Sequence, residues 1–237
     1  MDKYCNQAII LAGGRGERLR PLTFDRPKPM IEIFGHPILY YSLNWLKTCG
    51  FKKVIIACSY KHEVISQCFG DGSDVGLEVS YAIEGKPLGR GGGIKLASQQ
   101  LEDLNSPVLV LNGDLITRLA ISELFKSHKS SQANITIVTV PLHSPYGIVE
   151  INDQDLATEF REKPILPYWI NAGIYMVNGS MFSSFPDVGD HEETLFPRLA
   201  AQGQLHAYKF DGFWRTVDTL KDLEELKQHD EPVLANW

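Results

Sequence analysis

The chain has 237 residues, of which 43% are hydrophobic and 22% are charged, and 29 acidic against 23 basic residues give a net charge of −6. This composition is that of an average globular protein, the negative charge disfavours a nucleic-acid partner, and no apolar run reaches the ~20 residues of a membrane-spanning helix. The four cysteines (Cys5, Cys49, Cys58 and Cys68) include no Cys-x-x-Cys pair, which is typical of reduced thiols in a cytoplasmic protein.

Short apolar runs alternate with helical patterns in the first half of the chain. Continuous apolar runs are typical of buried strands, whereas apolar residues three or four apart indicate helices. We predict strands over Gln7–Ala12, Lys53–Cys58, Leu77–Ala82, Pro107–Leu111 and Asn134–Val140. We predict helices over Pro37–Cys49, Lys61–Phe69, Gly92–Leu104 and Ile121–Ser130. This alternation predicts an α/β fold with a Rossmann-like, mostly parallel sheet and helices on both faces.

The second half of the chain has shorter predicted strands, which suit antiparallel additions to the sheet. These strands are Gly147–Ile151, Thr158–Glu162, Gly173–Val177 and Leu205–Phe210. Helices are predicted over Glu192–Gln202 and Thr219–His229. No Ser-, Gly- or Pro-rich linker separates the halves, so we predict a single domain over residues 1–237.

A glycine-rich segment follows the first predicted strand directly and reads Leu11-Ala12-Gly13-Gly14-Arg15-Gly16. Glycines let backbone N–H groups approach a polyphosphate, and Arg15, Arg18 and Arg20 can supply cations. Leu19 stands where the dinucleotide-binding fingerprint requires a third glycine, and no Gly-Lys-Ser/Thr follows. Further on, Lys28 lies between two prolines, whose fixed φ angles suit a rigidly held charge. If the glycine-rich segment does not bind a phosphate, it is instead a tight turn with solvated arginines.

The segments LAGGRGERLRPLT and RPKPM together resemble the signature of the sugar-1-phosphate nucleotidyltransferases. These enzymes make an NDP-sugar and pyrophosphate from an NTP and a sugar 1-phosphate. The resemblance implies the nucleotide-diphospho-sugar transferase fold, a Mg²⁺ cofactor, a nucleotide-binding half over about residues 1–115 and a sugar-binding half over about 116–237. It also implies that Arg18 and Lys28 are catalytic and that residues 11–16 bind the nucleotide. Glu17 stands where the family more often has Thr or Ser.

Two aspartates are the predicted metal ligands. Asp114 follows a predicted strand in Asn112-Gly113-Asp114, where a carboxylate suits Mg²⁺ although a simple turn is the alternative. The family's second ligand lies in Trp-x-Asp-x-Gly-Thr, and here Thr216 stands at that Asp. The segment GFWRTVDT resembles instead the Phe-Trp-x-x-x-Asp-Thr of glucose-1-phosphate cytidylyltransferases, which implies Asp218. Because Asp218 precedes a predicted helix, its structural alternative is an N-cap.

Three further motifs resemble the family's sugar-binding segments. They are Tyr-Gly-x-Val around Gly147, Glu-Lys-Pro with Glu162 and Lys163, and Asn-x-Gly-Ile-Tyr beginning at Asn171. The resemblance implies that these four residues bind the sugar 1-phosphate. Considered without the resemblance, each of these motifs is an ordinary charged loop or the start of a strand.

The run from Glu84 to Lys95 resembles the base-binding loop of heptose-1-phosphate and mannose-1-phosphate guanylyltransferases, although Arg90 replaces a Thr. The resemblance implies GTP as the nucleotide, with base contacts from Glu84, Pro87, Leu88, Gly89 and Gly91. MurNAc-1-phosphate uridylyltransferases share much of this loop, so cytidylyl, uridylyl and thymidylyl transfer stay open.

Two other classes remain as alternatives. A non-catalytic nucleotide-sugar sensor would be expected to lose the arginine, the lysine or the metal carboxylates. A membrane-bound glycosyltransferase would need an Asp-x-Asp metal motif, and Asp153-Gln154-Asp155 has that spelling but is predicted to be a turn. The expected partners are an NTP and a sugar 1-phosphate, without a membrane, and a homo-oligomer is left open.

Overall fold

A computed structural model describes residues 6–229, so Cys5 lies outside the described residues. The strands are β1 (Gln7–Leu11), β2 (Glu32–Ile33), β3 (His36–Pro37), β4 (Lys53–Cys58), β5 (Glu78–Ile83), β6 (Val108–Asn112), β7 (Leu115–Thr117), β8 (Ile135–His143), β9 (Ile148–Ile151), β10 (Ala157–Arg161), β11 (Ile165–Val177), β12 (Leu205–Lys209) and β13 (Trp214–Thr216). The α-helices are α1 (Ile38–Thr48), α2 (His62–Phe69), α3 (Gly89–Ser98), α4 (Ile121–Ser131), α5 (Leu195–Ala201) and α6 (Leu220–His229). The short strands β2, β3, β7 and β13 were not predicted from the sequence.

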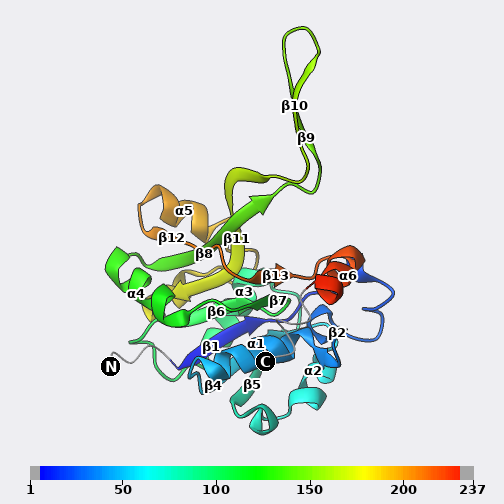
Figure 1. The fold of residues 1–237 in the computed structure, drawn as a ribbon. Coiled ribbons are helices and arrows are strands. Elements are labelled where there is room, and N and C mark those ends of the chain that lie inside the picture. Colours follow the sequence, from blue (N-terminus) through cyan, green and yellow to red (C-terminus); the bar gives the residue numbers. More distant parts are fainter. Residues whose placement is uncertain (1–5, 230–237) are drawn as a thin grey trace.

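Seven strands form the central sheet in the order β12-β8-β11-β6-β1-β4-β5 (Figure 1). Four of the neighbouring pairs are parallel, and β11 runs antiparallel to both β6 and β8. Strands from both halves of the chain therefore share one sheet. The predicted mixed, mostly parallel sheet is confirmed.

The two faces of the sheet are covered by different helices. Successive side chains of a strand point to opposite faces, so Ala8 and Ile10 of β1 pack in one apolar cluster and Ile9 in another. The first cluster includes buried residues of α1, α2 and α4, and the second includes those of α3 and α5. A third cluster joins α6 to α1 and β7. Because β1 is buried on both faces, its sequence is continuously apolar rather than alternating.

The glycine-rich part of the predicted base-binding loop is helical. We predicted a helix over Gly92–Leu104, but α3 begins three residues earlier and ends at Ser98. The segment that precedes α5 packs closely against the first turns of α3. A Cβ on Gly91 would lie 2.5 Å from Pro186 Cγ, and one on Gly92 would lie 2.5 Å from the carbonyl oxygen of Asp187. Because these glycines carry no side chain, the segment before α5 can pack directly against α3. The glycines belong to the helix and do not form a loop.

Two strands of the second half differ from the prediction. We predicted a strand over Gly173–Val177, but β11 begins eight residues earlier and spans the sheet from β6 to β8. We also predicted an antiparallel β12, whereas β12 runs parallel to β8. Strand β11 runs antiparallel to β8, and the connection through α5 reverses the chain again. Strand β12 therefore runs in the same direction as β8.

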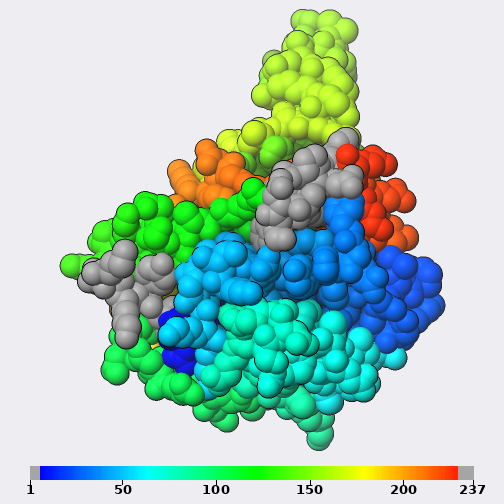
Figure 2. All heavy atoms as spheres, turned by 60° about the horizontal axis from the view of Figure 1, so that its bottom comes forward, coloured from blue at the N-terminus to red at the C-terminus, as the bar shows by residue number. Residues whose placement is uncertain are grey.

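Strands β9 and β10 form an antiparallel hairpin, which we call the arm, that projects from the body of the molecule (Figures 1 and 2). Asp153 and Asp155 lie in the turn between these strands, as predicted, and outside the cavity described below. Several large apolar side chains of the arm are exposed; they are Val149, Ile151, Leu156 and Phe160. None of the helices within residues 6–229 is both long and apolar enough to cross a membrane.

Candidate active site

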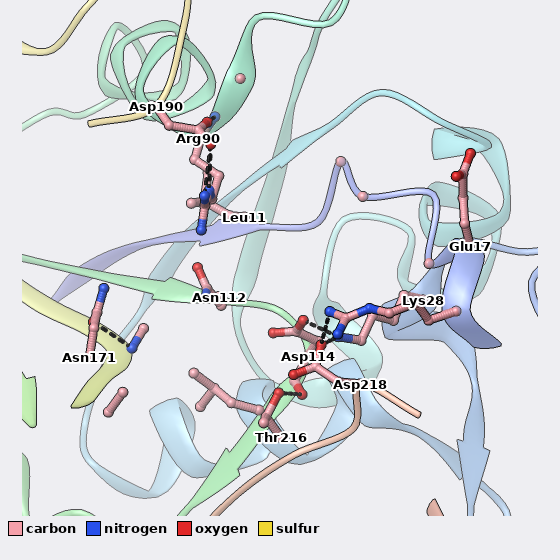
Figure 3. A pocket seen from close by; sticks show the side chains of 18 of the residues that line it. Leu11, Glu17, Lys28, Arg90, Asn112, Asp114, Asn171, Asp190, Thr216 and Asp218 are labelled. Carbon is pink, nitrogen blue, oxygen red and sulfur yellow. Dashed lines mark hydrogen bonds and ion pairs between the residues drawn. The ribbon is translucent and has the colours of Figure 1, made fainter. Parts of the chain in front are cut away.

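A cavity of about 890 Å³ opens at the carboxyl ends of β1 and β6 (Figure 3). Ligands of open α/β sheets bind at this edge. The lining residues are Leu11, Gly13, Gly14, Gly16, Glu17, Arg18, Lys28, Ser59, Glu84, Pro87, Gly89, Arg90, Asn112, Asp114, Leu115, Ile170, Asn171, Ala172, Gly173, Asp190, Trp214, Thr216 and Asp218. They come from both halves of the chain.

The glycine-rich loop after β1 borders the cavity with unpaired backbone groups. Within residues 6–229, the amides of residues 13–16 donate no hydrogen bond. Gly16 has a φ of 63°, and a Cβ there would lie 2.9 Å from Lys28 Cβ, so the loop packs tightly on the lysine that follows it. Unpaired N–H groups along such a loop form a concave site for the oxygens of a phosphate chain.

Lys28 lies at the centre of a charged cluster in the cavity. Its Nζ is 2.5 Å from Asp114 Oδ2 and 2.6 Å from Asp218 Oδ1, and Arg18 Nη2 is 3.2 Å from the same Asp218 oxygen (Figure 3). Lys28 is only 9% exposed and begins a short 3₁₀ turn, which Pro27 precedes and in which Pro29 is the second residue. The fixed φ of proline restricts the backbone on both sides of this charge. The cluster therefore holds two cations and two carboxylates, each within hydrogen-bonding distance of at least one partner of opposite charge.

The pairing of β7 with β13 brings the two aspartates together. Asp114 immediately precedes β7, and Asp218 follows β13 by two residues. The two strands are antiparallel with Leu115 opposite Thr216, so the residues just outside this pair meet at the cavity. The Thr216 hydroxyl donates to the backbone carbonyl of Asp114 at 3.4 Å and thus supports the turn that carries this carboxylate.

Asp218 is not the N-cap of α6. The Thr219 hydroxyl accepts a hydrogen bond from the Asp222 amide (3.2 Å), and Asp222 Oδ2 accepts from the amides of Thr219 (2.8 Å) and Asp218 (3.0 Å). These reciprocal bonds form a capping box with Thr219 as the cap, so the structural alternative for Asp218 is wrong. The Asp218 carboxylate is thereby free to face Lys28 and Arg18.

The carboxylate pair fits a magnesium ion. Both carboxylates already share one cation, the Lys28 ammonium group, and hard carboxylate oxygens are the ligands that Mg²⁺ prefers. No cluster of three or more His, Cys, Asp or Glu side chains suitable for a metal occurs among residues 6–229. Mg²⁺ typically takes one or two carboxylates and fills its shell with water and phosphate oxygens, so two are enough.

The side chains of Arg15 and Glu17 point to partners other than this cluster. The Arg15 guanidinium lies 5.9 Å from the Tyr60 ring centroid, and Arg15 does not line the cavity. Glu17 lines the cavity but pairs with Arg20 at 3.3 Å. Figure 3 shows the Glu17 carboxylate well apart from Asp114 and Asp218. The departure of Glu17 from the family pattern therefore leaves the charged cluster intact.

Three of the five predicted base-binding residues line the cavity, namely Glu84, Pro87 and Gly89. Glu84 Oε2 accepts a hydrogen bond from the Leu88 amide at 2.9 Å, and burial raises the pKa of this carboxyl. Leu88, the residue before α3, does not line the cavity. Gly91 is likewise absent from the lining and packs against the segment before α5.

The predicted sugar-binding residues lie in two places. Asn171 lines the cavity, donates to the Tyr175 hydroxyl at 2.9 Å and accepts from the Gly173 amide at 2.9 Å. Gly147, Glu162 and Lys163 lie at the base of the arm, outside the cavity lining. A Cβ on Gly147 would lie 2.6 Å from Phe160 Cζ and 3.0 Å from a Glu162 oxygen, so the structure requires a glycine there for packing.

Sequence reasoning missed several lining residues. Ser59 and Asn112 stand at the carboxyl ends of β4 and β6, where the rule for ligand sites in α/β sheets could have found them. The Asn112 side-chain oxygen is buried and has no hydrogen-bond partner within residues 6–229. Asp190 lines the cavity from the segment before α5, and nothing in its local sequence marks it.

A family model described as Nucleotidyl transferase matches residues 7–232. The chain belongs to the nucleotidyl transferase family. A mannose-1-phosphate guanylyltransferase of Mycobacterium tuberculosis is 35% identical over 223 residues, which cover 91% of this chain and 62% of that protein. A mannose-1-phosphate guanyltransferase of Schizosaccharomyces pombe is 32% identical over 245 residues, which cover 97% and 68%. The chain thus spans only part of the length of these relatives, 62% of the Mycobacterium tuberculosis protein and 68% of the Schizosaccharomyces pombe protein.

Solved structures confirm the nucleotide-diphospho-sugar transferase fold. HddC from Yersinia pseudotuberculosis has a TM-score of 0.75 at 28% identity, covering 94% of this chain and 98% of HddC. The same protein complexed with GMP-PN gives 0.75 at 27% identity over the same shares. A putative glucose-1-phosphate thymidylyltransferase from Bacillus anthracis shares the fold with a TM-score of 0.75 at 21% identity, covering 94% of each chain.

Proposed function

We propose that the chain is a Mg²⁺-dependent sugar-1-phosphate nucleotidyltransferase that makes an NDP-sugar and pyrophosphate from an NTP and a sugar 1-phosphate. The observation that carries the proposal is one cavity in which the unpaired amides of residues 13–16 lie beside Lys28, Asp114 and Asp218. Free N–H groups, a buried cation and two carboxylates suit a triphosphate with its metal. Membership of the nucleotidyl transferase family supports the same reaction.

In this reaction a phosphate oxygen of the sugar 1-phosphate attacks the α-phosphorus of the NTP in line, and pyrophosphate leaves. Such chemistry depends on positioning and charge neutralisation, and it requires no nucleophile on the protein. Arg18 and Lys28 stabilise the negative charge that develops on the leaving pyrophosphate. Lys163 neutralises the attacking phosphate.

Asp114 and Asp218 are the residues that would hold Mg²⁺. The ion, when bound, neutralises phosphate charge and polarises the phosphoryl oxygens. The chain's own contribution is to keep the two carboxylates at the end of the β7–β13 pair, where Thr216 supports the Asp114 backbone.

The preferred substrates in this proposal are GTP with a manno-configured heptose 1-phosphate or mannose 1-phosphate. The names of the relatives and the GMP-PN complex of HddC support a guanine nucleotide. Residues 1–115 bind the nucleotide in this scheme, and residues 116–237 bind the sugar phosphate through Gly147, Glu162, Lys163 and Asn171. Cytidylyl, uridylyl and thymidylyl transfer are the competing assignments within the same enzyme class.

The two other classes are less well supported by the described residues. A non-catalytic sensor has no need of the Arg18, Lys28, Asp114 and Asp218 cluster, which is complete. A glycosyltransferase would require its Asp-x-Asp motif at the sugar nucleotide, whereas Asp153 and Asp155 lie in the turn of the arm.

Pyrophosphate release, measured for GTP, CTP, UTP, dTTP and ATP against a panel of sugar 1-phosphates, tests the proposal. We expect the highest kcat/KM with GTP and a manno-configured sugar. A tenfold advantage for CTP, UTP or dTTP, about 1.4 kcal/mol of discrimination, would refute guanylyl transfer and retain the enzyme class. Absence of pyrophosphate release with every pair would refute the class and favour the sensor.

Two expectations about the chain's surroundings stay predictions, namely a cytoplasmic location and the absence of a nucleic-acid or membrane partner. The oligomeric state is left open. Light scattering determines it directly, since a monomer has a mass of 26.6 kDa.

A further inference from the structure

Arg90 stands where the resembled guanylyltransferases have a threonine, and it lines the cavity. It is the second residue of α3, two residues after Leu88, whose amide binds Glu84. Figure 3 shows Arg90 and Asp190 at the end of the cavity away from Lys28, Asp114 and Asp218. If the charged cluster holds the phosphates, Arg90 lies at the end that is left for the nucleobase.

The Arg90 guanidinium is held in one orientation by two carboxylates. Nε and Nη2 donate to Asp190 Oδ2 at 3.2 and 2.7 Å, and Nη1 lies 2.8 Å from Glu192 Oε1. The Arg90 amide also donates to Asp190 Oδ1 at 2.8 Å. A guanidinium carries five N–H groups, so at least two remain beyond these contacts. The side chain is 51% exposed, and these groups are therefore available to a ligand in the cavity.

Glu84 supplies a fixed acceptor in the same part of the cavity. One of its carboxylate oxygens is held by the Leu88 amide. The other, Oε1, accepts no hydrogen bond within residues 6–229 and lies beside Gly13 and Gly93. The end of the cavity near α3 thus presents a carboxylate acceptor and a guanidinium donor, each fixed by its own protein partners.

We propose that Arg90 determines the choice of nucleobase by donating a hydrogen bond to the carbonyl oxygen O6 of guanine, while Glu84 accepts from the N1–H and 2-amino groups. This inference rests on the proposed function of the cavity as a nucleotide site. Adenine presents an amino donor where guanine presents O6, and an arginine cannot accept from it. Arginine pairs with guanine O6 more often than any other side chain does.

A purely structural role for Arg90 is the competing explanation, because its ion pairs also fix the segment before α5 to α3. Lys95 provides a control, since it also makes an ion pair from α3 to that segment, with Asp187 at 2.8 Å. Lys95 does not line the cavity. The two cations therefore share the structural role, and only Arg90 lies where it could contact a base.

The test is equilibrium binding of GTP and of 2,6-diaminopurine riboside triphosphate, which has an amino group in place of O6, measured by calorimetry. Wild type should bind GTP more tightly by roughly 10- to 100-fold, as expected for one good pairing with a base. Arg90→Thr should reduce this ratio by roughly tenfold by weakening GTP binding alone, and the discrimination that remains comes from Glu84, because N1 of 2,6-diaminopurine carries no proton to donate. Lys95→Thr should keep the wild-type ratio.

An unchanged ratio in Arg90→Thr, or equal binding of both nucleotides by wild type, would overturn the inference. If Arg90→Thr does not fold, Arg90→Met keeps the length of the side chain without its hydrogen-bond donors and should lose the preference in the same way. Pyrophosphate release by the wild-type protein, measured separately, tests the proposed function. Binding selectivity that depends on Arg90 without turnover would refute the enzyme and retain the inference.

Discussion

Asp218→Asn should abolish most of the turnover and leave stability nearly unchanged. In the folded chain Asp218 Oδ1 lies 2.6 Å from Lys28 Nζ and 3.2 Å from Arg18 Nη2, and Thr219 caps α6 in its place. Lys28 keeps its contact with Asp114 at 2.5 Å in the variant, so its charge retains a partner. Because the Asp218 side chain is 36% exposed, we expect the free energy of unfolding to change by no more than about 1 kcal/mol.

The effect on catalysis should be much larger. Replacing one of two metal carboxylates by a neutral amide should lower kcat by roughly 10²- to 10³-fold and raise the Mg²⁺ concentration for half-maximal rate. Thr219→Ala is the matched control, because it removes the cap and no charged group of the cavity. It should cost about 1 kcal/mol of stability, lower Tm by roughly 2–4 °C, and leave kcat near that of wild type.

Two measurements on both variants distinguish a metal-ligand role of Asp218 from a helix-capping role. They are pyrophosphate release over a Mg²⁺ titration and thermal unfolding. Wild-type turnover of Asp218→Asn at low Mg²⁺ would refute the metal role and leave Asp114 as the carboxylate ligand. Wild-type stability of Thr219→Ala would refute the assignment of the cap.

Arg18→Ala and Lys28→Ala should each lower kcat by roughly 10²- to 10³-fold, as loss of a fixed charge donor does, and wild-type rates in pyrophosphate assays would remove them from the mechanism. Lys163→Met should raise KM for the sugar 1-phosphate and leave KM for GTP unchanged; equal changes in both would contradict its assignment to the sugar phosphate. Burial lowers the pKa of His191 to about 4, so the unfolded chain binds a proton that the folded chain excludes, and stability should fall as pH decreases from about 6.5 to 4. The loss assignable to His191 is about 3 kcal/mol, and chemical denaturation should show a smaller decrease in His191→Phe.

The fold class could be predicted because its signals are local. The apolar run within Lys53–Cys58 and the helical stripe of α1 depend on residues close in sequence, and both elements occur within one residue of their predicted ranges. The glycine loop and the fixed position of Lys28 could also be predicted. Glycine permits, and proline imposes, particular backbone angles whatever the rest of the chain does. The resemblance of these segments to the family then predicted most of the charged cluster.

Tertiary contacts decided what local patterns could not. Asp114 and Asp218 are 104 positions apart, and only the pairing of β7 with β13, two three-residue strands without a clear pattern, places them on one lysine. Helix α3 begins at Gly89, three residues before its predicted start, where a segment almost 100 residues later packs against its first turns. That same segment holds Arg90 through Asp190. Short strands and close packing are stabilised by distant partners, so the sequence of each segment alone does not determine them.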